Sequence, residues 1–275
     1  MKKYILQYFI PVVALCLLYA CKKSDGVTNQ PYLAYGTAGT NGQLKINIAY
    51  AYTINSANAL IKLNGTAVSN LLAGRTPFPG GGFNTNGSNF AIYLAVPTGA
   101  NAVSVVIPKV GTNVDSIVLY STTVTIPDNS PYTLHITDTL VSSTVNNTKS
   151  VLVKNLIPNI DTGRALYRFV NLMPNVPSVD LYLNGILVKG GAGYLVATDT
   201  FSIRTGVNAP GYTPSTTATW AIRPAGAAST TTALATYASA SPLASQGVFT
   251  AFAMGYSGGL TTRLPFISFT MDKNQ

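Results

Sequence analysis

Apolar and polar residues alternate with a period of two along much of this chain, and this pattern restricts its fold more than any other feature. Alternation places apolar side chains on one face of a strand, and no stretch keeps a helical period. The clearest segments are 45–48, 59–63, 103–107, 132–136, 166–170, 179–183, 220–222 and 249–254. Glutamate is absent, and only 9% of the residues are charged. Because β-branched and aromatic side chains suit strands, the sequence predicts an all-β protein.

Two Asn-Gly pairs indicate an internal duplication. Asn64-Gly65 and Asn184-Gly185 each follow an apolar strand, and Asn-Gly is the strongest short signal for a β-hairpin turn. Segments 105–111, 119–124 and 130–136 align in turn with 220–226, 234–239 and 247–253. A repeat of about 115–120 residues is close to the length of one β-sandwich. The pattern therefore predicts two tandem immunoglobulin-like β-sandwich domains.

Composition shifts suggest where these parts begin and end. We expect a signal peptide at 1–20, a lipidated cysteine and tether at 21–31, and the first sandwich at 32–141. A polar, strand-poor linker is predicted at 142–150, and the second sandwich at 151–275. Trp220, which alternates with Ile222, is expected in the core of the second sandwich.

The N-terminus has the pattern of an export signal. Lys2 and Lys3 precede an apolar stretch over 4–18, which is shorter than the roughly 20 residues of a membrane span. Ala20-Cys21 resembles the lipobox of bacterial lipoproteins, and this resemblance implies that Cys21 is diacylated. Cys16 would leave with the signal, so no disulfide is expected in the mature chain. We expect an outer-membrane anchor that faces outward, with the periplasmic face as the alternative.

The second half resembles a known family. Residues 168–185, with Val179-Asp180-Leu181-Tyr182-Leu183-Asn184-Gly185, look like the opening of the family called domain of unknown function 4397. The resemblance covers 164 to about 258, whereas the first half looks like a degenerate copy without the prolines and the aspartate. It implies an extracytoplasmic immunoglobulin-like sandwich and no established activity.

The residue inventory argues against catalysis. His135 is the only histidine, and we expect it half-exposed on a strand without a triad partner. Asp180 is expected to accept hydrogen bonds rather than to act as an acid or base. No zinc or calcium ligand pattern occurs. The net charge of +9 is spread over scattered residues, which does not suit nucleic acid. We therefore predict no enzyme activity, no metal, no cofactor and no nucleic-acid partner.

One long loop has the composition of a binding site. Residues 75–89 combine aromatic and amide side chains, which stack on sugar rings and hydrogen-bond to hydroxyls. The candidate ligand-binding residues, including one from the shorter loop of the second half, are Arg75, Phe78, Phe83, Asn84, Asn86 and Tyr194. The alternative for the phenylalanines is packing against the sandwich. The sequence thus suggests a lipoprotein that binds a glycan or another envelope component, or else a structural or adhesive module that docks a partner protein.

Overall fold

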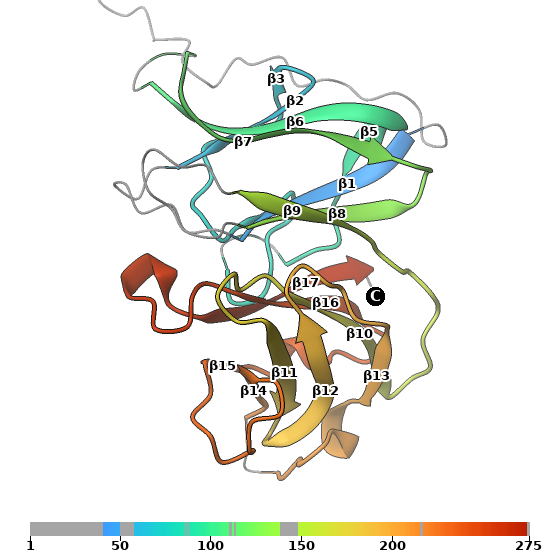
Figure 1. Ribbon diagram of the computed structural model, residues 1–275. Coiled ribbons are helices and arrows are strands. Elements are labelled where there is room, and N and C mark those ends of the chain that lie inside the picture. Colours follow the sequence, from blue (N-terminus) through green and yellow to red (C-terminus); the bar gives the residue numbers. More distant parts are fainter. Residues whose placement is uncertain are drawn as a thin grey trace, which may run out of the picture.

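The computed structural model describes residues 41–49, 58–85, 87, 89–109, 112, 114–137, 148–214 and 217–273. These ranges contain strands and three short 3-10 helices, which confirms the predicted all-β class and its sandwich architecture. The immunoglobulin-like subtype stays a prediction. The strands form four sheets, which lie one above another as successive layers (Figure 1).

The first unit supplies the two upper layers. Its strands are β1 (Asn41–Ile48), β2 (Leu60–Leu63), β3 (Thr66–Ala67), β4 (Pro77–Phe78), β5 (Leu94–Pro97), β6 (Gly99–Pro108), β7 (Asp115–Ile126), β8 (Pro131–Thr137) and β9 (Lys149–Lys154). The outer sheet of this unit has the order β3-β2-β6-β7. Its inner sheet has the order β4-β1-β8-β9, and β5 also pairs with β1.

The second unit supplies the two lower layers. Its strands are β10 (Arg164–Asn171), β11 (Ser178–Leu183), β12 (Ile186–Gly193), β13 (Phe201–Arg204), β14 (Thr219–Pro224), β15 (Ala235–Ala238), β16 (Val248–Met254) and β17 (Phe266–Lys273). The 3-10 helices are η1 (Gly206–Asn208), η2 (Ser241–Leu243) and η3 (Thr261–Arg263). The inner sheet has the order β13-β10-β16-β17, and the outer sheet has the order β12-β11-β14-β15.

The strand orders confirm the predicted duplication. In each inner sheet the first strand of the unit pairs in parallel with a later strand, β1 with β8 and β10 with β16. Both Asn-Gly pairs form the expected turns, with φ of 50° at Asn64 and Asn184 and positive φ at Gly65 and Gly185. The two asparagine side chains accept equivalent backbone hydrogen bonds, from Ala102 and Thr219 respectively.

The division between the units falls later than expected. We predicted a linker at 142–150 and a second sandwich from 151, but β9 spans Lys149–Lys154 and pairs with β8. By strand pairing, β9 belongs to the first unit. Asn155 N also donates to Pro131 O and extends this pairing, so the connection to β10 runs through residues 156–163. Residues 1–40, which carry the predicted signal peptide and Cys21, lie outside the described residues.

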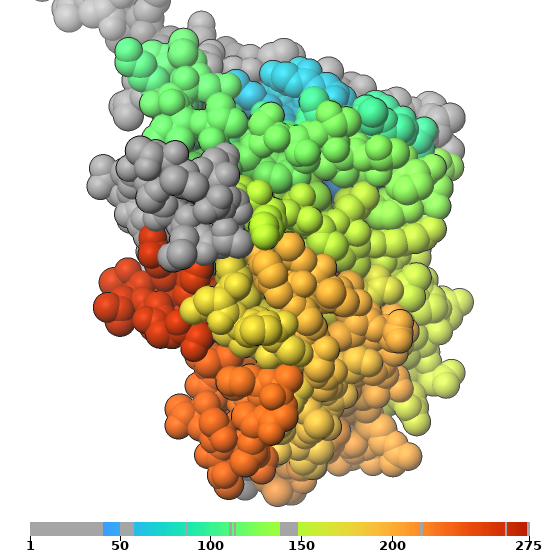
Figure 2. All heavy atoms as spheres, in the orientation of Figure 1, coloured from blue at the N-terminus to red at the C-terminus, as the bar shows by residue number. Residues whose placement is uncertain are grey.

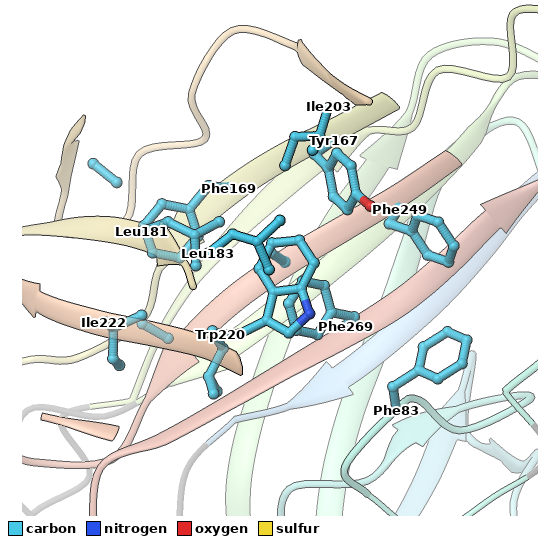
Figure 3. Packing of buried hydrophobic residues seen from close by; sticks show 14 of the residues in the cluster. Phe83, Tyr167, Phe169, Leu181, Leu183, Ile203, Trp220, Ile222, Phe249 and Phe269 are labelled. Atoms are coloured by element: carbon cyan, nitrogen blue, oxygen red, sulfur yellow. The ribbon is translucent and has the colours of Figure 1, made fainter. Parts of the chain in front are cut away.

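Three apolar layers separate the four sheets. One core fills the first sandwich and includes Leu44, Ile46 and Val105. Another fills the second sandwich around Trp220 and Phe269, whose ring centres lie 4.7 Å apart (Figure 3). A smaller cluster lies between the two inner sheets. The space-filling view shows the two units in contact along this face of the molecule (Figure 2).

Trp220 is fully buried, as predicted, so Trp220→Ala is expected to lower the free energy of unfolding by about 3–5 kcal/mol. Leu71→Ala serves as the control because Leu71 is 43% exposed, and its change should stay within about 0.5 kcal/mol. Urea unfolding measures both variants. Circular dichroism is the signal to follow, because Trp220→Ala removes the only tryptophan and with it the tryptophan fluorescence. Equal effects of the two variants would contradict this core assignment.

Candidate functional site

The predicted binding loop leaves the first unit and contacts the second. It begins beside β4, where Phe78 is the register partner of Ile46 on β1. Phe78 is half-buried and packs against the core of the first sandwich. The following residues reach the last strand of the second unit, β17.

Phe83 is an internal side chain in this arrangement. Its backbone forms an antiparallel bridge with Phe269, with Phe83 N donating to Phe269 O at 2.8 Å. The ring is 7% exposed and meets Phe249 edge-to-face, with centroids 5.8 Å apart (Figure 3). Phe83 therefore belongs to the core of the second sandwich and presents no open ring face for stacking on a ligand.

Two further predicted residues contact the same part of the second unit. Arg75 Nη2 donates to Leu264 O at 2.6 Å, and its guanidinium lies 5.3 Å from the centre of the Phe266 ring. Burial lowers the pKa of Arg75. Asn84 Nδ2 donates to Ile267 O at 2.8 Å. The structure thus brings Arg75, Phe83 and Asn84 together, but as a clamp on β17 and the residues before it.

The remaining predicted residues are not part of this clamp. Tyr194 N donates to Pro177 O, and Tyr194 forms a bridge with Asn171 of β10. Since β10 and β17 are separated by β16 in the inner sheet, Tyr194 and Phe83 contact different strands of that sheet. Asn86 lies outside the described residues.

The sequence reasoning missed the exposed apolar residues of this region. Phe90 is 56% exposed and Ile92 is 43% exposed, just beyond the segment 75–89. They flank the glycine turn closely, because a Cβ at Gly80 would lie 2.7 Å from Phe90 O and 3.2 Å from Ile92 Cβ. Their position directly after the asparagine-rich stretch was the available signal.

The contact between the two inner sheets, which we call the seam, contains buried polar groups. Lys45 Nζ donates to Met271 O at 3.2 Å and lies 5.0 Å from the centre of the Tyr93 ring. Burial lowers the pKa of Lys45 to about 8, and the charge of Asp272 opposes this shift. Burial also raises the pKa of Tyr93, reinforced by Asp272.

Asp272 is the fully enclosed carboxyl group of the seam. Its Oδ2 accepts from Thr250 Oγ1 at 2.6 Å, and its Oδ1 accepts from Asn155 Nδ2 at 3.3 Å. Burial raises the pKa of Asp272 to about 6, while the positive charges of Lys45 and Arg168 act in the opposite direction. The carboxyl group is therefore held by hydrogen bonds from both β16 and the first unit.

His135 also lies in the seam, which corrects our expectation of a half-exposed histidine. It is fully buried because the second unit covers the outward face of β8. Its Nδ1 lies 2.9 Å from Asn47 Nδ2, and its ring centre is 5.6 Å from that of Phe252. Burial, reinforced by the charge of Lys45, lowers the pKa of His135 to about 3.

Asp180 has the role that the sequence suggested. Its Oδ1 accepts from Gly191 N at 2.7 Å and its Oδ2 accepts from Gly226 N at 2.9 Å. The buried carboxylate thereby joins β12 to the turn after β14. Among the described ranges, no group of three or more His, Cys, Asp or Glu side chains could hold a metal ion. The described part of the chain also has no helix long and apolar enough to cross a membrane.

The fold and these contacts define a protein of two β-sandwiches that are related by internal duplication. The sequence model of the family described as domain of unknown function (DUF4397) matches residues 63–182, which confirms the predicted resemblance to this family. The match falls mainly on the first unit, which we had interpreted as degenerate, and ends in β11. It covers one repeat, since Leu63 and Leu183 each precede an Asn-Gly turn. No curated protein matches the chain.

The clamp assigns Phe83 a structural role that can be measured. Phe83→Ala is expected to lower the free energy of unfolding by about 3–5 kcal/mol, because it removes a buried ring from the second core. Phe90→Ala is the matched control in the same region, where an exposed ring contributes within about 0.5 kcal/mol. Denaturant unfolding compares them, and a Phe83 variant as stable as the Phe90 variant would refute the clamp.

The seam predicts opposite pH effects of two groups. The folded-state pKa of His135 is depressed, so its contribution to stability falls as pH drops below 6.5. The folded-state pKa of Asp272 is raised, so its contribution grows as pH falls through 6 toward 3.8. Between pH 6.5 and 4 the change in each group's contribution to the free energy of unfolding is about 2–3 kcal/mol. The two changes have opposite signs and therefore nearly cancel.

Two variants separate these contributions. Relative to the unmodified chain, His135→Leu should gain stability as pH falls from 6.5 to 4, whereas Asp272→Asn should lose stability over the same range. Urea unfolding at several pH values gives both differences. Parallel pH profiles for the two variants would contradict this account.

Proposed function

We propose that this chain is a lipid-anchored, non-catalytic module of the cell envelope that docks a partner protein. The observation that carries the proposal is that the aromatic loop, residues 75–89, packs against the second unit. Arg75, Phe83 and Asn84 contact the second unit. These residues therefore join the two sandwiches into one body instead of forming the predicted ligand-binding loop. The enclosure of His135 and Asp272 in the seam supports a non-catalytic role.

Lipidation of Cys21 would attach this body to the membrane. Two acyl chains give a stable anchor where one is marginal. The lipobox-like Ala20-Cys21 supports lipidation. The proposal also includes display of the chain on the outward face of the outer membrane. The body itself would then serve as the part that meets other envelope components.

The long edge strand β7 is the surface best suited to a protein partner. β7 is the last strand of the outer sheet of the first unit and pairs there with β6. From Tyr120 to Ile126 its register is regular and its sequence has neither charge nor proline. Charges, prolines and bulges are the usual protection of sheet edges, and an edge without them pairs readily with an added strand.

Crosslinking on intact cells tests this docking. A photo-crosslinking amino acid at Thr123 or Thr125, both exposed, should give one discrete adduct of higher mass. The same substitution at Leu260 serves as the control, since Leu260 is 76% exposed and far from β7 in the sequence. Monomer alone at every position, or the same adducts from Leu260, would contradict the proposal.

Glycan binding is the second candidate, favoured by the exposed ring of Phe90. A ring that is 56% exposed beside Asn89 can stack on a sugar. A polysaccharide panel against residues 22–275 tests this, with Phe90→Ala as the variant expected to lose binding. Leu71→Ala is the matched control. Binding that Phe90→Ala leaves unchanged would remove Phe90 from the site.

A further inference from the structure

The seam brings equivalent residues of the two units face to face. The registers β1–β8 and β10–β16 match row by row: Asn47 pairs with His135 and Val170 pairs with Phe252. His135 and Phe252 are therefore equivalent, and their rings contact each other across the seam with centres 5.6 Å apart. Contact of a residue with its own counterpart occurs at the axis of a two-fold interface.

A second pair of equivalent residues does the same. Lys154 on β9 and Met271 on β17 occupy equivalent register positions, although the register of β17 shifts just after Met271. The next residues, Asn155 and Asp272, correspond through their side chains, because Asn155 bonds to Thr133 and Asp272 to its equivalent Thr250. Asn155 Nδ2 donates to Asp272 Oδ1 across the seam at 3.3 Å. Each of these two contacts joins equivalent residues of the two units and therefore lies on the symmetry axis. The line through both contacts is a local two-fold axis in the seam.

One polar contact away from this line occurs as a symmetric pair. Lys45 is equivalent to Arg168, and each donates to a backbone carbonyl of the opposite unit. Lys45 bonds to Met271 O and Arg168 bonds to Lys154 O, and these two acceptors are themselves equivalent. The same polar contact is thus made twice.

The hydrogen bonds within each unit follow the same symmetry. Thr133 and Thr250 are equivalent. Thr133 Oγ1 accepts from Asn155 Nδ2 at 2.8 Å, and Thr250 Oγ1 donates to Asp272 Oδ2 at 2.6 Å. Each unit therefore presents a polar side chain to the axis next to the equivalent threonine, Asn155 in the first unit and Asp272 in the second.

From these contacts we infer that each inner sheet is a docking surface for a second copy of the same unit, and that this chain consists of two such copies joined through residues 156–163. The seam is an isologous interface in which a patch meets its own equivalent. The two copies have diverged at the axis, where Asn155 faces Asp272 and His135 faces Phe252. One carboxylate on the axis serves two symmetric cations, Lys45 and Arg168, whichever unit supplies it.

Exchange of the axial residues tests this inference in the full chain. Asn155→Asp places two buried carboxyl groups against each other, and Asp272→Asn leaves the buried Lys45 and the half-buried Arg168 without a carboxylate. Each single variant should lower the melting temperature by at least about 6 °C. The double variant Asn155→Asp/Asp272→Asn restores one carboxylate at the equivalent position, so its melting temperature should return to within about 2 °C of the unmodified chain.

A control separates symmetry from simple restoration of charge. Asn171→Asp combined with Asp272→Asn also keeps one buried carboxyl group, but Asn171 bonds to Val176 O within the second unit and away from the axis. This pair should remain as destabilised as the sum of its single variants. Rescue by Asn171→Asp, or failure of the Asn155/Asp272 exchange to recover more than either single variant, would overturn the two-fold seam. Thermal unfolding at pH 7.5 gives all these values without any binding partner, so the outcome is independent of the proposed docking function.

Discussion

The seam between the two inner sheets is the contact on which the rest of the structure depends. It covers the outward face of β8, so that every residue from Pro131 to Thr137 is buried. Removing polar groups from water is costly unless they are hydrogen-bonded. Lys45, Thr250 and Asp272 meet this requirement through bonds that largely cross the seam or lie along it. The polar part of the seam therefore fixes how the apolar parts align.

The sequence predicted the local structure well because local structure depends on neighbouring residues. The alternation identified strands, and the turn at Asn184-Gly185 formed as expected because both residues adopt positive φ. Alternation also shows which residues share a face of a strand. It does not show what covers that face, so His135, which lies between Thr133 and Thr137, was expected to be half-exposed.

The candidate site was harder to predict for a related reason. An aromatic residue in a glycine-rich loop suits a ligand platform and a packing contact equally well. Phe83 bonds to Phe269, a partner 186 positions away, and no local pattern encodes that choice. By contrast, Asp180 was interpreted correctly, because a carboxylate on a strand next to glycine turns finds its backbone donors close by.

The duplication also sets the valency of the molecule. A two-fold body presents every surface twice, and the counterpart of β7 in the second unit is β15. Yet β7 has 12 residues and β15 has four. The edge that suits strand addition is thus long on one side only. In the proposed docking, the long edge β7 therefore offers one site per molecule, which favours one-to-one complexes over chains of linked partners.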